Sequence, residues 1–109
     1  MKFTINGKEY EGAKYNYNTS CAFEEYGVAV SDIVRKPMNV LRAYLSISSG
    51  MDIYEAGNEI EAHLIAGGDI QDIQKALGHE MSESGFFQTL LNKVKEDEES
   101  PETQEKKKK

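Results

Sequence analysis

Two pairs of polar side chains have the residue types of a metal or proton-transfer site. Glu59 and His63 are four residues apart, so a helix would place both on one face. A zinc site needs three or four ligands, and the other histidine, His79, follows a glycine that we expect to end a helix. We therefore interpret Glu59 and His63 as a solvated pair, place His79 and Glu80 in a loop, and predict no metal site.

The sequence gives no stronger indication of nucleophilic catalysis or phosphate binding than of a metal site. Cys21 is the single cysteine, and a cysteine beside a histidine is a nucleophile in some enzymes. A free cysteine is more often a small buried residue, which is the interpretation we favour. Gly67 and Gly68 precede a predicted helix as phosphate-binding glycines do, but a helix end followed by a turn explains them fully. The sequence therefore predicts neither an enzyme nor a bound cofactor.

The widest apolar face of the chain lies on its last predicted helix. Neighbouring helix positions lie about 100° apart, so this face is wider than one packed element readily covers. It is either partly exposed for a partner or fully internal, because a small domain needs every large apolar side chain it has. The candidate partner-binding residues on this face are Phe86, Phe87, Leu90, Leu91 and Val94.

Tyrosines gather near the N-terminus and form a second candidate surface. The chain has six tyrosines and no tryptophan, and Tyr10, Tyr15 and Tyr17 lie close together in sequence. A tyrosine ring buries apolar area at an interface while its hydroxyl stays hydrated, so Tyr15 and Tyr17 are further partner-binding candidates. Ordinary cross-strand packing is the alternative.

A β-hairpin over residues 2–17 should carry these tyrosines. Phe3 and Ile5 alternate with polar neighbours, and Asn6-Gly7 is the dipeptide that accepts the positive φ angles of a tight hairpin turn. The second arm is expected to bend at Gly12. A two-stranded ribbon is marginally stable alone, so it must pack on helices or pair with another chain.

About five short helices follow over residues 18–95. The first has capping side chains at Asn18, Thr19 or Ser20 and ends at Gly27. The second begins at Pro37 and ends at Gly50, and the third begins at Asp52 with a narrow apolar stripe. The stripe comprises Ile53, Ala56, Gly57, Ile60 and Leu64.

Asp69 should cap the fourth helix, which Gly78 should end. Ser82 should cap the last helix, with Met81 packing on Phe86. The predicted fold class is thus α+β and mostly helical, with one globular domain over residues 1–95. Residues 96–109 contain no apolar side chain to offset the entropy of ordering, so we expect a disordered charged tail.

Charge and composition exclude several classes of partner. The formal net charge is −6, and residues 1–105 hold 9 basic and 19 acidic side chains, a net charge of −10. A nucleic-acid-binding protein needs a concentrated basic face, and anionic membranes are disfavoured for the same reason. No apolar run approaches the ~20 residues of a membrane span. The N-terminus lacks a secretory signal, so we expect a cytoplasmic protein.

Two stretches resemble tail assembly chaperones of long-tailed bacteriophages of Gram-positive hosts. The first combines the "NGKEY" turn, the "NYNT" entry and a helix ending in "EEYG" within residues 1–33. The second is "ALGHEMSESGFFQTLLNKVKE", with the serine-glycine-aromatic-aromatic step at Ser84, Gly85, Phe86 and Phe87. The likeness covers about residues 1–95 and is weaker in the centre.

The resemblance implies a non-enzymatic role in viral tail assembly. Such chaperones bind the long, helical and apolar tape measure protein and keep it soluble while tail tube subunits polymerise around it. They act in the host cytoplasm and are absent from the mature virion. The resemblance also implies a longer form, made by programmed ribosomal frameshifting, that recruits other tail proteins such as the tail tube protein.

Lys106–Lys109 could be encoded by a slippery adenine run, or could be a solubilising tail or an artificial end of the chain. Self-association is left open. The alternative function is a small adaptor or regulatory module that binds a folded partner through the edge of its hairpin.

Overall fold

The computed structural model describes residues 1–29, 32–33 and 35–99. These residues form a two-stranded antiparallel hairpin followed by five helices, which confirms the predicted α+β, mostly helical fold class. The elements are β1 (Lys2–Ile5), β2 (Lys8–Glu11), α1 (Tyr17–Glu25), α2 (Pro37–Ser49), α3 (Ile53–Ile65), α4 (Gln71–Ser82) and α5 (Gly85–Glu99).

The hairpin forms where the sequence predicts it. Asn6 and Gly7 both have positive φ, at 51° and 79°, as a primed turn requires. Phe3 pairs with Tyr10 across the strands, and their ring centroids are 5.7 Å apart. Strand β2 ends at Glu11, so the prediction of a strand arm reaching residue 17 is wrong. The chain turns there because the Gly12 N–H donates to the Met1 carbonyl oxygen and Ala13 binds α2 instead.

Helix α1 begins two to four residues earlier than predicted. Asn16, rather than Asn18, Thr19 or Ser20, is the N-cap, and its side chain accepts from the Thr19 N–H at 2.9 Å. The Thr19 hydroxyl donates to the Lys14 carbonyl oxygen, which fixes the entry to the helix. Thr19 and Ser20 are therefore buried inside the first turns instead of capping them.

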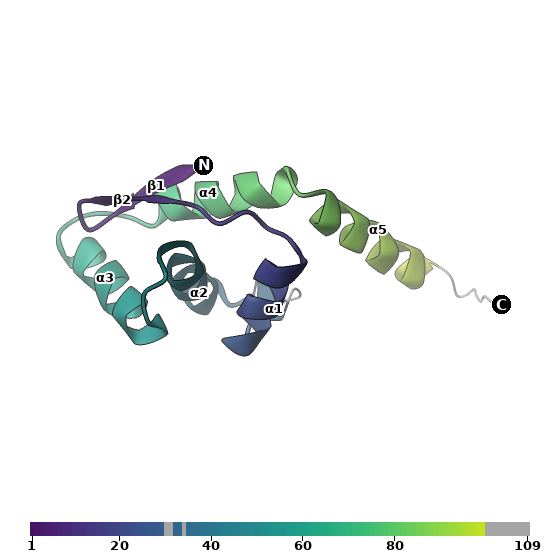
Figure 1. Ribbon diagram of the computed structural model, residues 1–109, viewed down its shortest axis with the longest axis horizontal. Helices are drawn as coiled ribbons and strands as arrows, with labels where there is room; N and C mark the ends of the chain where they lie inside the picture. The colour runs from purple at the N-terminus through teal and green to yellow at the C-terminus, as the bar shows by residue number, and fades with distance from the viewer. Residues whose placement is uncertain (30–31, 34, 100–109) are drawn as a thin grey trace.

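Helices α2 and α3 have the predicted ends. Pro37 occupies the first turn of α2, and Gly50 is its C-cap. Asp52 caps α3 by accepting from the Tyr54 N–H at 2.9 Å. The two helices pack side by side below the hairpin and α4 (Figure 1).

The prediction that Gly78 ends α4 is wrong, because the helix continues through it to Ser82. Buried Leu77 and Glu80 lie on either side of Gly78, so tertiary contacts hold the helix together there. Consequently His79 and Glu80 are helical and do not lie in a loop. The predicted cap at Ser82 is wrong too, since Ser84 accepts from the Phe87 N–H at 2.9 Å and begins α5.

A single cluster of buried residues lies between the hairpin, α1, α2 and α4. Tyr44 of α2 is at its centre, with its ring stacked on Phe23 at 6.3 Å and near Phe3 at 5.9 Å. Its hydroxyl donates to the Ala13 carbonyl oxygen at 2.8 Å. The hairpin thus avoids the marginal stability of an isolated ribbon by packing on α4 and α2.

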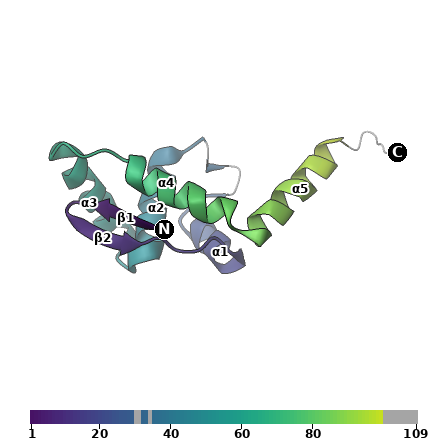
Figure 2. The same ribbon diagram turned by 90° about the horizontal axis from the view of Figure 1, so that it is seen from above.

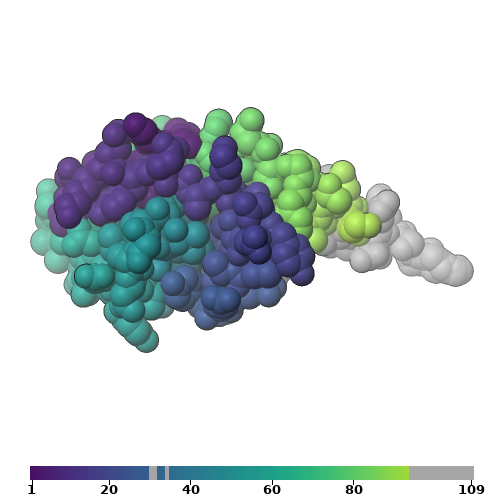
Figure 3. All heavy atoms as spheres, in the orientation of Figure 1, coloured from purple at the N-terminus to yellow at the C-terminus, as the bar shows by residue number. Residues whose placement is uncertain are grey.

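Helix α5 projects from this body. It leaves the end of α4 and extends away from the other helices in both views (Figures 1 and 2) and in the space-filling view (Figure 3). It continues to Glu99, so four residues assigned to the disordered tail are helical. The rest of the predicted tail, residues 100–109, lies outside the described residues.

Candidate partner-binding surface

An apolar groove opens between α2 and α3. It has a volume of about 570 Å³. We call it the α2–α3 groove, and define it by its lining residues: Met38, Asn39, Leu41, Arg42, Gly57, Ile60, Glu61, Leu64, Ile65 and Ile70.

The groove has large apolar side chains that the fold leaves uncovered. Met38 is 71% exposed, Ile65 is 78% exposed and Leu64 is 39% exposed. Ala56 and the groove residue Leu41 are buried and belong to the core. Burying apolar surface yields about 25 cal/mol per Å², so this groove favours an apolar partner.

Local sequence signals place these side chains. Pro37 starts α2 and so puts Met38 in its exposed first turn. Gly57 has no side chain between the helices, and Arg42 of α2 lies directly over it. Three residues of the predicted α3 stripe, Gly57, Ile60 and Leu64, line this groove. Of the other two, Ala56 is buried and Ile53 packs against the core.

Sequence reasoning did not identify the groove. The sequence predicts only a narrow apolar stripe on α3, and packing against α2 and β1 leaves part of it uncovered. One signal was available, because Ile65 lies next to Leu64 and widens the stripe beyond what a neighbouring helix covers.

The predicted face of α5 is only partly open. Phe86, Phe87 and Leu90 are half-buried, and Leu91 is 38% exposed. Phe87 lies edge-on to Tyr15, with ring centroids 5.3 Å apart, while Phe86 lies at 6.3 Å from the same ring. The two phenylalanines therefore attach α5 to the body, and Leu91 is the most accessible of these four. The side chain of Val94 is outside the described part of the structure.

Tyr15 and Tyr17 have opposite environments. Tyr15 is buried between α1 and α5, so its prediction as a partner-binding residue is wrong for this conformation. Burial raises the pKa of its hydroxyl, which lies 3.4 Å from Ser20 Oγ. Tyr17 is 68% exposed and lies edge-on to Phe86. Tyr10 packs across the hairpin on Phe3, as the alternative of cross-strand packing predicts.

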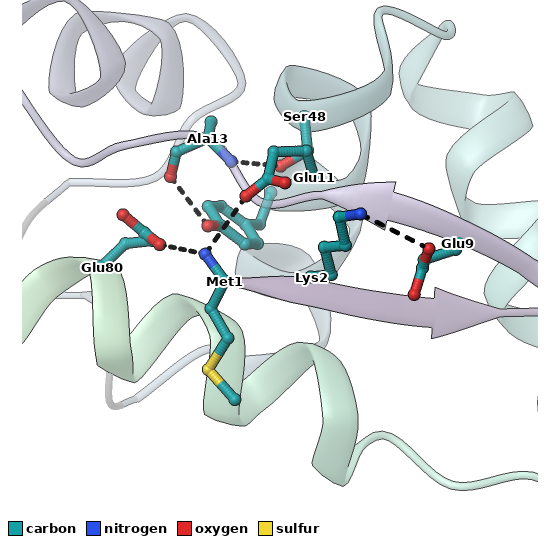
Figure 4. A network of polar contacts seen from close by, with 8 residues as sticks. Met1, Lys2, Glu9, Glu11, Ala13, Ser48 and Glu80 are labelled. Carbon is teal, nitrogen blue, oxygen red and sulfur yellow. Dashed lines mark hydrogen bonds and ion pairs between the residues drawn. The ribbon is translucent and has the colours of Figure 1, made fainter.

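The N-terminal amine is held in a polar network between the hairpin and α4 (Figure 4). Met1 donates to the buried carboxylate of Glu80, and to Glu11 at 3.3 Å. The hydrogen bond to Glu80 raises the pKa of this amine, with a smaller contribution from Glu11. This network joins the start of β1 to α4.

The His63 ring links the hairpin turn to the segment before α4 through hydrogen bonds. Its Nδ1 accepts from the Asn6 N–H at 2.9 Å, and its Nε2 lies 2.8 Å from the Asp69 carbonyl oxygen, which requires the Nε2–H tautomer. Asn6 also donates to Glu59, so the predicted pair binds the hairpin turn. Cys21 is half-buried on α1. No group of three metal-ligating side chains occurs among the residues that the structure describes.

None of the helices in the described part of the chain has both the length and the apolar character of a bilayer span. No protein-family model matches this chain, and comparisons with curated proteins and with solved structures give no match either.

Proposed function

We propose that this protein is a tail assembly chaperone of a long-tailed bacteriophage and that it binds the tape measure protein during tail morphogenesis. The observation that carries the proposal is the α2–α3 groove, with Met38, Leu64 and Ile65 uncovered on a small acidic body. An apolar, helical client would bury these side chains. The net charge would keep the complex in solution.

The resemblance supports the same role, and its residues have defined places in the fold. The "NGKEY" stretch forms the hairpin turn and β2. In the serine-glycine-aromatic-aromatic step, Ser84 caps α5 while Phe86 and Phe87 pack near Tyr15. These residues therefore determine where α5 leaves the body, and Leu91 remains a secondary candidate for client contact.

The proposal includes the other expectations from the resemblance. The protein would act in the host cytoplasm and be absent from the virion, and a frameshifted longer form would recruit the tail tube protein. The codons of Lys106–Lys109 test the last point, since a gene without a slippery run there rules out slippage at that site.

The alternative adaptor function has less support. The Thr4 N–H on the outer edge of β1 donates to Asp72 of α4 at 2.8 Å, so this edge is already occupied. The other strand, β2, has four residues, of which three are charged. Such a short and charged edge is a weak template for an added strand.

Co-expression with a tape measure gene, which the proposal expects as a long open reading frame beside this one, tests the proposed function. The expected result is that the tape measure protein becomes soluble and is retained with the tagged chaperone. Ile65→Asp should abolish both effects, because it places a carboxylate in the apolar groove. Gln74→Asp is the control, since it adds the same carboxylate at an exposed position of α4 that does not line the groove.

Two results would count against the proposal. A tape measure protein that stays insoluble with the wild-type chain would contradict the chaperone role. Retention by folded Ile65→Asp at the wild-type level would show that the groove is not the client surface. Leu91→Asp then tests α5, and it is preferable to Phe87→Asp because Phe87 also packs on Tyr15.

A further inference from the structure

Arg42 closes one end of the α2–α3 groove. Its stem crosses from α2 onto α3 at Gly57, where an added Cβ would lie 3.1 Å from Arg42 Cδ. The guanidinium carbon lies 5.7 Å from the centre of the Tyr54 ring, and Nη2 donates to Asn39 Oδ1 at 2.8 Å. The guanidinium is therefore fixed at the groove end before any partner binds.

Arg42 forms no ion pair with a carboxylate in the described ranges. Glu61 also lines the groove, but it is not paired with Arg42. A guanidinium has five N–H donors in a planar fork that matches a carboxylate, and one donor is used on Asn39. Residues 1–105 have a net charge of −10, yet Arg42 is held in place without a carboxylate partner. Its guanidinium is therefore complementary to an acidic group on a ligand.

The groove also limits the length of its ligand. Between Gly57 and Ile65, α3 rises about 12 Å, which corresponds to about two helical turns. An apolar stripe at positions i, i+3, i+4 and i+7 has this length. A helix C-terminus presents unpaired carbonyl groups and a negative dipole end, both of which favour a guanidinium.

We infer that the α2–α3 groove binds an amphipathic helix whose apolar stripe ends, on its C-terminal side, in a carboxylate that pairs with Arg42. This inference rests on the proposed function, because it specifies the chemistry of the client segment. Met38, Leu64 and Ile65 cover the apolar stripe, and Arg42 sets the direction in which the helix lies. The client segment is thereby defined by its pattern of residues.

Three synthetic peptides of about 18 residues test the inference, a length at which partial helicity is attainable. All have blocked termini and the same leucine stripe, and they differ only in one residue after the stripe, which is Glu, Gln or Lys. Binding to the full chain is followed by fluorescence anisotropy. The expected order of affinity is Glu, then Gln, then Lys, with about fivefold between Glu and Gln at low salt.

Reversing the charge of Arg42 shows whether Arg42 pairs directly with the peptide carboxylate or only supports the shape of the groove. Arg42→Glu should invert the order, so that the Lys peptide binds best. Glu61→Gln is the matched control, since it removes the other charged group of the groove and should leave the Glu peptide preferred. High salt should reduce the differences between peptides without abolishing binding.

The outcomes distinguish the inference from the function on which it rests. Equal binding of all three peptides, lost in Ile65→Asp, would overturn the role of Arg42 and leave the groove as a client surface. Failure of every peptide to bind would overturn the groove as a helix site. A mass that rises with concentration in wild-type protein but not in Ile65→Asp would assign the groove to a second copy and also overturn the inference.

Discussion

The hydroxyl of Ser84 donates to the carbonyl oxygen of Tyr15 at 2.6 Å, although the two residues are far apart in sequence. The Ser84 hydroxyl oxygen in turn accepts from the Phe87 N–H at 2.9 Å. One buried side chain therefore both begins α5 and fixes it to the segment before α1. The orientation of the projecting helix depends on this link.

Ser84→Ala should lower the free energy of unfolding by about 2 kcal/mol, because it removes a helix cap and leaves the buried Tyr15 carbonyl without its partner. Urea unfolding followed by circular dichroism measures this change. Ser82→Ala is the control, since Ser82 is exposed and bonds only to the preceding turn, and it should cost less than about 0.5 kcal/mol. Equal effects of the two substitutions would contradict the assigned cap.

Alkaline pH should destabilise the protein in two stages. The Met1 amine has a raised pKa, so its stabilising contribution is complete below its unfolded value of about 8 and is lost as the pH rises through its folded value. Burial raises the pKa values of Tyr44 and Tyr15, so a further loss begins above about pH 10. Melting temperatures measured from pH 7 to pH 11 should show both stages.

Glu80→Gln tests the first of these stages. It removes the carboxylate that raises the pKa of the amine, so the variant should be less stable at pH 7 and change less between pH 8 and pH 10. A stability difference from wild type that stays constant over this range would contradict the role of the amine.

Gly68→Ala should destabilise the fold by about 1–3 kcal/mol through overpacking. An added Cβ would lie 2.5 Å from the His63 ring, and hydrogen bonds at both nitrogens hold that ring in place. In a His63→Ala background the same substitution should cost much less, which a double-mutant cycle by urea unfolding measures. Additive effects would show that the ring is not the obstacle.

Gly57→Ala should weaken the selection of peptides by Arg42 without lowering the free energy of unfolding. Alanine in a helix interior is favoured over glycine by up to about 1 kcal/mol, but the new Cβ would displace the stem of Arg42. Stability should therefore not fall, while the preference for the Glu peptide over the Gln peptide should shrink. Gly78→Ala is the control, because its Cβ meets open space on α4 and should leave peptide binding unchanged.

Local signals predicted those parts of the fold that depend on neighbouring residues. Asn6-Gly7 gave the hairpin turn, Pro37 the start of α2 and Asp52 the cap of α3, because each acts through its own backbone. The predicted helix end at Gly78 was wrong because one glycine costs a helix only about 1 kcal/mol. The burial of Leu77 and Glu80 on the same helix outweighs that cost.

The candidate surface was harder to predict than the fold. Phe86 and Phe87 were recognised as an apolar face, but their contact with Tyr15 joins residues distant in sequence. The groove depends on which sides of α2 and α3 remain uncovered after packing, and periodicity within one helix does not contain that information. Ile60 and Leu64 show this, since their four-residue spacing is that of core residues although both line the groove.

Methyl NMR spectra of isoleucine-labelled protein, recorded as a tape measure fragment is added, test the central claim most directly. Ile60, Ile65 and Ile70 line the groove, whereas Ile5 and Ile73 are buried in the core and serve as internal controls. The account predicts shifts for the three groove methyls and little change for the two core methyls. Binding of the fragment with unchanged groove methyls would contradict it.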